Sequence, residues 1–180
     1  DNNPSLHRGP YLGAATTSGI TVSWYTDVPS SSRVRFGPST TNLSGTVDLP
    51  AQVLQHEVSI TGLQPNTTYF YTIGTIAQDL IGADATLFFK TSPVQGSEQP
   101  LRVWVIGDAG WATVAQAGVR DSYLNFIGTT GKADAWLMLG DNVYPHGRES
   151  EYQLGIFHNM YESILRNTTL WPAPGNHDYY

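Results

Sequence analysis

The hydrophobic pattern of this 180-residue chain changes near Pro93, and the change limits which folds the chain can adopt. Before Pro93, short runs alternate apolar with polar residues and are separated by turn-forming residues, as in half-buried strands. The runs span residues 20–25, 33–37, 56–60, 69–73 and 86–90. Short alternating strands at this spacing are typical of a small all-β sandwich. We therefore expect a first domain over residues 1–93.

After a small and polar linker at residues 94–100, the pattern becomes strand, helix, strand, helix, strand. We expect one helix over residues 115–127, ending at Gly128, and another over residues 154–165. The expected strands span residues 101–106, 135–139 and 170–174. Two prolines restrict the last of them to an edge strand or an irregular extended segment. Alternating strands and helices favour a parallel sheet, so residues 101–180 are predicted to belong to a second, α/β domain.

The composition excludes several classes of function. With a net charge of −6 and only nine Lys and Arg residues, the chain has no basic surface for nucleic acid or an anionic membrane. No apolar stretch approaches the length that spans a bilayer. The absence of Cys excludes disulfides and thiolate metal sites. Attraction for an anionic substrate must therefore come from local charges, which bound metal cations would supply.

Three short segments directly follow the predicted strands of the second domain, at residues 107–110, 140–144 and 175–178. Ligands of open α/β sheets bind outside the carboxyl ends of the strands, so polar side chains in these segments are candidates for one site. Asp108 and Asp141 occupy the same position after neighbouring strands, and two such carboxylates repel unless a cation lies between them. Taken alone, Asp108 could equally be a turn or helix-capping residue.

Tyr144, Asn176 and His177 add a phenol, an amide oxygen and an imidazole to the same edge. Carboxylate, phenolate and amide oxygens are hard donors, which suit iron(III), manganese or magnesium, whereas imidazoles suit zinc or iron(II). A single histidine at such a place is also compatible with an ordinary hydrogen-bonded loop residue. The repeated arrangement after three strands nevertheless predicts a metal site.

The first half of the chain resembles a fibronectin type III domain. Residues 62–71 match the corner between its strands E and F, in which a tyrosine bonds back to the corner. Tyr69 is the candidate for that tyrosine, and Trp24 is the candidate central core residue.

The polar segments of the second half resemble the first three of the five motifs of purple acid phosphatases, in the calcineurin-like metallophosphoesterase superfamily. The matching residues are Asp108 with Gly110, then residues 140–144 and 175–178, in that order. Larger members of that family carry a fibronectin-like domain before the catalytic one. The resemblance implies a fibronectin III-like sandwich followed by the N-terminal half of an αββα metallophosphoesterase sandwich.

The resemblance also implies metal ligands. Asp108 and Tyr144 would bind iron(III), Asp141 would bridge both metals, and Asn176 would bind a second, divalent metal, which is iron, zinc or manganese. Tyr144 is the discriminating residue, because charge transfer from a tyrosinate to iron(III) gives this family its colour.

On the substrate side, His177 would contact the phosphate or protonate the leaving oxygen, with Asp178 orienting it. Asn142 and His146 are further candidates for substrate binding. For His146, the alternative is an exposed loop histidine that takes no part in the site.

The last two motifs of the family supply three histidine ligands, and no residue after His177 matches them. His7, His56 and His158 have other sequence contexts and are expected to be surface or loop residues. We therefore expect the chain to be a fragment of a longer enzyme, whose C-terminal remainder would be its partner. A partial sheet of this kind would leave an exposed edge and an uncovered apolar face.

The resulting prediction is an acid phosphatase that hydrolyses small-molecule or protein phosphate monoesters by attack of a metal-activated hydroxide. The alternatives are a phosphodiesterase or nucleotide hydrolase of the same superfamily, and a non-catalytic fibronectin-like binding module or inactive fragment. Glycosylation patterns at Asn42, Asn66 and Asn167 weakly favour a glycoprotein that is secreted, extracellular or periplasmic. Neither nucleic acid nor a membrane is expected as a partner.

Overall fold

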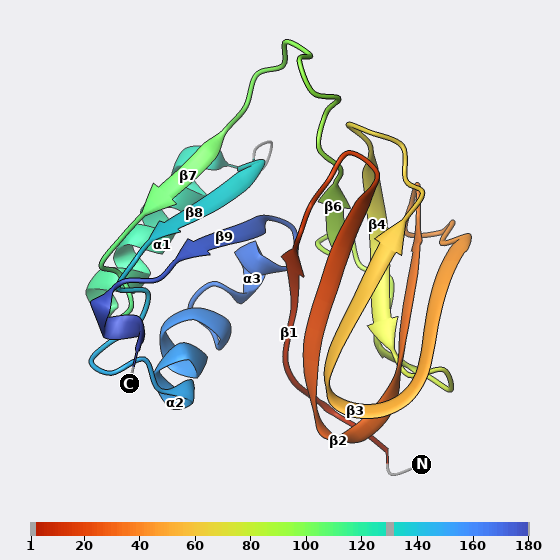
Figure 1. Cartoon of the computed structure of the whole chain (residues 1–180), viewed down its shortest axis with the longest axis horizontal. Coiled ribbons are helices and arrows are strands. Elements are labelled where there is room, and N and C mark those ends of the chain that lie inside the picture. The colour runs from red at the N-terminus through yellow and green to blue at the C-terminus, as the bar shows by residue number, and fades with distance from the viewer. Residues whose placement is uncertain (1–2, 129–131, 180) are drawn as a thin grey trace. The chain divides into compact units, whose positions relative to one another are not determined.

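The structure, a computed structural model, describes residues 3–128 and 132–179 and divides into two compact units, residues 1–99 and 100–180 (Figure 1). Among these described residues, the longest helices are too short or too polar to cross a bilayer.

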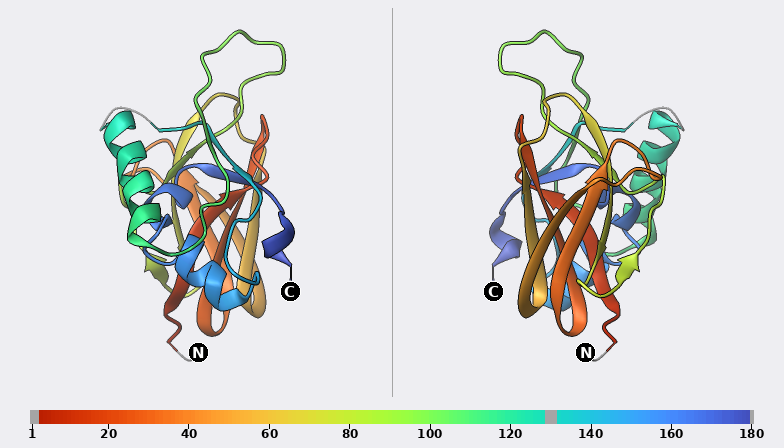
Figure 2. Two further views of the ribbon diagram at one scale, coloured as in Figure 1. Left: turned by 90° about the vertical axis from the view of Figure 1, so that its left-hand side faces the viewer. Right: turned by 90° about the vertical axis from the view of Figure 1, so that its right-hand side faces the viewer.

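The first unit is a β-sandwich of antiparallel strands. Its strands are β1 (Leu6–Gly13), β2 (Gly19–Gly37), β3 (Gly45–Thr61), β4 (Thr68–Gly74), β5 (Asp79–Ile81) and β6 (Phe88–Lys90). The central strand β2 pairs with β1, β3 and β4, and β4 pairs in turn with β5 and β6. The long strands β2 and β3 run side by side along the whole unit (Figures 1 and 2). Alternate residues of these strands point into one core, because successive side chains of a strand face opposite sides.

The two strands predicted at residues 20–25 and 33–37 are parts of the single strand β2. The prediction of separate strands is wrong because the chain stays extended through Pro29 and Ser30, where the register against β3 shifts. Such a bulge tolerates a proline, since the residue has no N–H that would need a partner in the ladder.

The predicted tyrosine corner and tryptophan core are both confirmed. The hydroxyl of Tyr69 accepts a hydrogen bond from the backbone N–H of Gln64 at 3.0 Å. Trp24 is fully buried and stacks on the ring of His56, with ring centroids 4.7 Å apart. His56 is therefore a core residue, and its prediction as a surface or loop residue is wrong.

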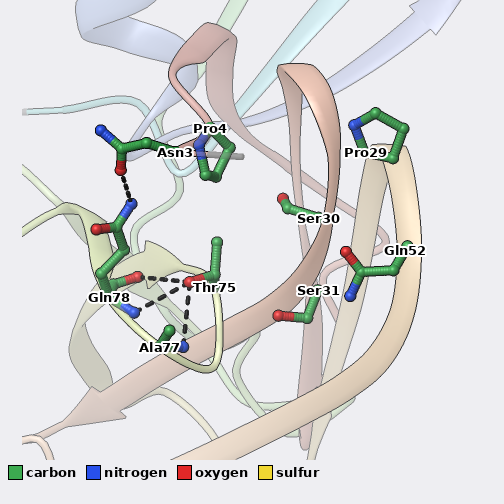
Figure 3. A pocket seen from close by; sticks show the side chains of 9 residues that line it. All are labelled: Asn3, Pro4, Pro29, Ser30, Ser31, Gln52, Thr75, Ala77 and Gln78. Atoms are coloured by element: carbon green, nitrogen blue, oxygen red, sulfur yellow. Dashed lines mark hydrogen bonds between the residues drawn. The ribbon is translucent and has the colours of Figure 1, made fainter. Parts of the chain in front are cut away.

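A small cavity of about 100 Å³ lies at one end of the first unit (Figure 3). Its lining comes from the N-terminal segment, the bulge of β2, strand β3 and the turn between β4 and β5, and includes Ser30, Ser31, Gln52, Thr75 and Gln78. These side chains are neutral. Ser31, Thr75 and Gln78 hydrogen-bond to nearby backbone or to Asn3, and the buried hydroxyl of Ser30 has no partner among the described residues. The cavity therefore offers no charge for a phosphate ester, and the chemistry predicted above must lie in the second unit.

The second unit alternates strands with helices around a parallel sheet. In chain order its elements are β7 (Val103–Ile106), α1 (Val114–Ile127), β8 (Ala135–Leu139), α2 (Glu149–Tyr152), the π-helix η1 (Gln153–Phe157), α3 (Glu162–Leu165), β9 (Thr169–Ala173) and the 3₁₀-helix η2 (Asn176–Asp178). The strand order is β7, β8, β9, and all pairs are parallel, as predicted. The proline-containing strand β9 lies at an edge of this sheet, which confirms the prediction made from its two prolines.

The two faces of the parallel sheet differ in what covers them. On one face the indoles of Trp104 and Trp136 stack with centroids 4.7 Å apart and contact the rings of Tyr123 and Tyr161. On the other face apolar side chains of all three strands are about half exposed: Val103, Val105, Leu139 and Trp171. The expected uncovered apolar face is therefore present in the described residues.

Helix α1 begins after Thr113, whose hydroxyl accepts a hydrogen bond from the backbone N–H of Gln116, and ends at Gly128 as predicted. The single helix predicted over residues 154–165 is wrong. The π-helix η1 ends at His158, where the backbone becomes extended, and Asn159 adopts a left-handed conformation before α3 begins. The apolar pattern misled the prediction because Ile156 and Ile164 are buried on both sides of this break.

Candidate metal centre

Three loops converge at the carboxyl ends of β7, β8 and β9, as the sequence predicts. The backbone N–H of Asp108 donates to the carbonyl of Gly140 at 3.2 Å, and that of Tyr144 donates to the carbonyl of Gly110 at 3.2 Å. The N–H of His177 donates to Oδ1 of Asp141 at 2.9 Å. These bonds tie the first loop to the second and the second to the third, so the candidate residues belong to one site.

Glycines make this close approach possible. A Cβ atom on Gly110 would lie 1.9 Å from the carbonyl oxygen of Asn142. A Cβ on Gly175 would lie 2.3 Å from both the backbone nitrogen and Oδ1 of Asp141. Both distances are far inside van der Waals contact, so only glycine fits at either position.

The two candidate carboxylate ligands share an uncommon backbone conformation. Asp108 has φ of 55° and Asp141 has φ of 49°, both in the left-handed region that non-glycine residues seldom adopt. Strained conformations of this kind persist where surrounding structure holds them, and they cluster at functional sites. The same left-handed φ thus recurs directly after strands β7 and β8.

The phenol of Tyr144 joins these carboxylates. Its hydroxyl lies 2.8 Å from Oδ1 of Asp108 and 3.1 Å from Oδ2 of Asp141, so a single proton is shared by two acceptors. Partial burial, followed by the hydrogen bonds and negative charge of the two carboxylates, raises the pKa of Tyr144. Three oxygen donors that gather around one proton form a set that fits a hard cation, because a cation would satisfy both carboxylates and the phenolate together.

Asn176, the predicted ligand of a second metal, is exposed at the start of η2 and directly follows Gly175, whose backbone touches Asp141. It therefore lies at the same rim, and its role as a ligand stays a prediction. Within residues 3–128 and 132–179, no three His, Cys, Asp or Glu side chains gather closely enough to hold a metal ion. The donor set on this chain is thus Asp108, Asp141 and Tyr144, with Asn176 beside it.

The ring of His177 is held in a defined orientation. Its Nδ1 lies 2.9 Å from the carbonyl oxygen of Pro145, and its centroid lies 4.7 Å from that of Tyr144. A carbonyl can only accept, so Nδ1 carries the proton of this bond. The other nitrogen, Nε2, is then the atom that can exchange a proton with a ligand.

The carboxylate of Asp178 does not orient this ring, which corrects the predicted role. Its Oδ1 accepts from the backbone N–H groups of Asn142 at 2.8 Å and Val143 at 3.2 Å. Its Oδ2 accepts from the N–H of Gly175 at 2.7 Å. Asp178 therefore fixes the loop after β8 to the loop after β9, and Pro145 orients His177.

Asn142, a predicted substrate-binding residue, is bonded to the protein itself. It is only 4% exposed, and its Nδ2 donates to the carbonyl of Ala173 and to Oδ2 of Asp178. A buried side chain bonded in this way positions the loop, and contact of Asn142 with a substrate stays a prediction. His146 lies exposed in the next turn, with its backbone N–H bonded to Glu151, so a role in substrate binding stays a prediction.

Sequence reasoning missed Trp111, the residue directly after the first loop. Its ring stacks on that of Tyr144, with centroids 4.5 Å apart and an angle of 8° between the planes. The available signal was its position, because it follows Gly107–Gly110 in the sequence with no intervening residue.

Comparison with known families agrees with this division of the chain. The family described as "Purple acid Phosphatase, N-terminal domain" matches residues 10–91, and the family described as "Calcineurin-like phosphoesterase" matches residues 101–180. No curated protein matches the sequence significantly.

Among solved structures, one described as "Structure of PhoD" matches 94% of this chain with a TM-score of 0.66 and 13% sequence identity. The chain spans only 38% of the length of that structure, and at this identity the likeness concerns the fold alone. A fibronectin type III domain of human contactin 1 matches 56% of this chain and 86% of its own, with 17% identity and a TM-score of 0.39. The FN5 domain of Drosophila Lar matches 49% and 94%, with 21% identity and a TM-score of 0.35.

Proposed function

We propose that this chain, which belongs to the purple acid phosphatase family of calcineurin-like phosphoesterases, provides the iron(III)-binding part of an acid phosphatase that hydrolyses phosphate monoesters. The match of residues 101–180 implies a hydrolase of phosphate esters with a dinuclear metal centre, and the match of residues 10–91 is to the domain that precedes it in purple acid phosphatases. The observation that carries the proposal is the phenol of Tyr144, held between the carboxylates of Asp108 and Asp141.

The donor set favours iron(III) as the first metal. Asp108, Asp141 and Tyr144 offer hard anionic oxygens, and a trivalent cation would displace the shared proton from the phenol. Oδ1 of Asp141 accepts from the N–H of His177 in the third loop, and its Oδ2 accepts from Tyr144, whose hydroxyl also reaches Asp108 of the first loop. A carboxylate placed between these groups suits a bridging ligand, and Asn176 would contribute to a divalent metal. The three histidine ligands expected for the family would come from residues beyond this chain. When bound, the metals would activate water and neutralise charge on the phosphoryl group.

His177 would act on the substrate side of the site. With Nδ1–H bonded to Pro145, the imidazolium form of His177 would donate the proton on Nε2 to a phosphate oxygen or to the departing alkoxide, which leaves the neutral ring protonated at Nδ1. Contact with the ring of Tyr144 limits how far the imidazole can turn. The chain itself thus supplies the anionic donors and one proton donor, held on loops that its glycines bring together.

Replacement of Tyr144 tests the proposal. We expect the whole protein, loaded with iron(III), to absorb visible light through a tyrosinate-to-iron band and to hydrolyse aryl phosphates. Tyr144→Phe should abolish the band and reduce phosphatase activity by at least roughly 10-fold, because a hard anionic ligand is lost. The matched control is Tyr179→Phe, which removes an exposed hydroxyl nearby and should leave the band intact.

Two results would contradict the proposal. Tyr144→Phe protein that keeps the visible band would show that another group binds the iron. Wild-type protein that binds neither iron(III) nor phosphate esters would exclude a phosphatase of this kind.

A further inference from the structure

The rim of the candidate metal centre carries a large exposed aromatic ring that the proposed function does not use. Trp111 is 56% exposed, although it directly follows the loop that contains Asp108. A single exposed apolar side chain is common on a protein surface, so the place of Trp111 beside Tyr144 matters more than its exposure. Because Trp111 lies beside the candidate metal ligands, a ligand that stacks on its ring would be one bound at this site.

One face of the indole of Trp111 is already covered. It stacks almost parallel on Tyr144, with centroids 4.5 Å apart, and the hydroxyl of Tyr144 contacts both carboxylates. The exposure of Trp111 therefore comes from the opposite face and the edge of its ring. The stacked ring of Tyr144 connects Trp111 to the groups that would hold the metals.

The turn that carries Trp111 is fixed rather than loose. Ala112 has φ of 52°, and its N–H donates to Oε1 of Gln116 at 2.7 Å. Gln116 is 5% exposed, and its Nε2 donates to the carbonyl of Gly155 at 2.8 Å and to the hydroxyl of Tyr161 at 3.1 Å. Because one face of the indole stacks on Tyr144 and the backbone of the turn is hydrogen-bonded, Trp111 loses little conformational entropy when it binds another ring.

We propose that Trp111 is a specificity-determining residue that stacks on an aromatic ring in the leaving group of the substrate. This inference rests on the proposed phosphatase function. A ring bonded directly to the ester oxygen lies beside the phosphoryl group, and Trp111 lies beside the Tyr144 phenol that contacts both carboxylates. In a nucleotide a ribose separates the base from the phosphate, so an aryl leaving group is the simpler match to a ring this near the candidate ligands. The enzyme should therefore prefer aryl phosphates to alkyl phosphates.

The preference is measurable without turnover. Phenylphosphonate and methylphosphonate carry the same anionic group and differ in the ring, and adenosine 5′-monophosphate tests the nucleobase alternative. In the whole metal-loaded protein, calorimetry should show phenylphosphonate binding roughly 3- to 10-fold more tightly than methylphosphonate, the range expected for one aromatic pair. Nuclear magnetic resonance should show a ring-current shift of the Trp111 indole N–H with phenylphosphonate only.

Three variants separate stacking from other effects. Trp111→Leu should abolish the preference while methylphosphonate still binds, and Trp111→Phe should retain most of it. Phe126→Leu, at a residue of α1 that is 90% exposed, is the matched control and should leave the preference unchanged.

Other outcomes would overturn the inference in distinguishable ways. Equal binding of the two phosphonates, or a preference that survives in Trp111→Leu, would exclude stacking while the phosphatase function stands. If Trp111→Leu no longer binds methylphosphonate, the role of the indole is to hold Tyr144 in place and not to contact the substrate. If adenosine 5′-monophosphate binds more tightly than phenylphosphonate and this depends on Trp111, the ring that stacks on Trp111 is a nucleobase and not an aryl leaving group. If neither phosphonate binds the wild-type protein, the proposed function fails and this inference fails with it.

Discussion

At the residue scale, the carboxylate of Asp178 illustrates how a polar side chain can build a site without taking part in its chemistry. It accepts hydrogen bonds from backbone N–H groups of both neighbouring loops and from the hydroxyl of Tyr152, at 3.1 Å. Burial and the charge of Asp178 raise the pKa of Tyr152 to about 12, so that hydroxyl stays a donor at neutral pH. These bonds hold the second and third loops in register.

Asp178→Asn should therefore act on stability. The amide keeps one acceptor oxygen, and backbone donors left without a partner should cost roughly 2 kcal/mol in the free energy of unfolding of the second unit. Urea denaturation measures the loss. The control is Asp121→Asn on α1, whose exposed pair with Arg120 should contribute under about 0.5 kcal/mol. Unchanged stability of Asp178→Asn together with a fall in activity would restore a catalytic role to this residue.

The buried side chain of His56 should make the stability of the first unit depend on pH. Burial lowers the pKa of His56 to about 4 from 6.5, while hydroxyls of Ser32 and Thr26 bond its two nitrogens at 2.8 and 2.9 Å. The unfolded chain takes up the proton first, so stability is full above pH 6.5 and is lost as the pH falls toward 4. The loss should approach roughly 3 kcal/mol, since each unit of pKa corresponds to about 1.4 kcal/mol.

Fluorescence of Trp24, which stacks on His56, can follow this unfolding as a function of pH. His56→Gln should remove most of the slope between pH 4 and 6.5. His158→Gln, at an exposed histidine of the second unit, should leave it in place. A first unit whose stability is flat over this range would contradict a buried neutral histidine.

At the scale of elements, the site depends on how closely three loops approach one another. A methyl group on Gly175 would collide with the backbone and carboxylate of Asp141, so Gly175→Ala must push the bridging candidate out of place. We expect a loss of roughly 1–3 kcal/mol in stability and a clear weakening of metal binding. Calorimetric titration with iron(III) and thermal unfolding measure both effects.

The matched control for this change is Gly118→Ala. Gly118 is exposed within α1 and has open space around a new Cβ, so the substitution should stabilise the helix by about 0.5–1 kcal/mol. If Gly175→Ala behaves like this control, the third loop does not need its close contact with Asp141.

The elements also show why sequence periodicity succeeds in one helix and fails in another. Helix α1 has a capping residue at its start and a left-handed glycine at its end, and both are local signals. The helix expected at residues 154–165 has a continuous apolar pattern, but the π-helix η1 packs Gly155 closely against the first loop. A Cβ atom added to Gly155 would lie 3.1 Å from the carbonyl oxygen of Gly110. Packing against the first loop thus decides where this helix breaks, and no local pattern records that contact.

At the scale of the molecule, the two units place their polar groups in different environments. The first buries its polar residues in a closed sandwich, where hydroxyls satisfy His56. The second gathers its polar residues at the open edge of a parallel sheet, where every strand ends beside its neighbour. The second arrangement brings the carboxylates of Asp108 and Asp141 together around Tyr144, where we propose that a cation and a substrate bind.

The sequence alone determined the order of the two units, the strands of the parallel sheet, the tyrosine corner and the convergence of Asp108, Asp141, Tyr144 and His177. The units and strands follow from local periodicity and turn residues, and the convergence follows from the rule that parallel strands end at one edge. The tyrosine corner follows from the resemblance to a fibronectin type III domain. Tertiary structure alone decided that Asp178 and Asn142 support the loops, that His56 is buried and that Trp111 covers Tyr144. The physical reason is that partners distant in sequence set the direction, burial and hydrogen bonds of a side chain, and a linear pattern contains no record of those distances.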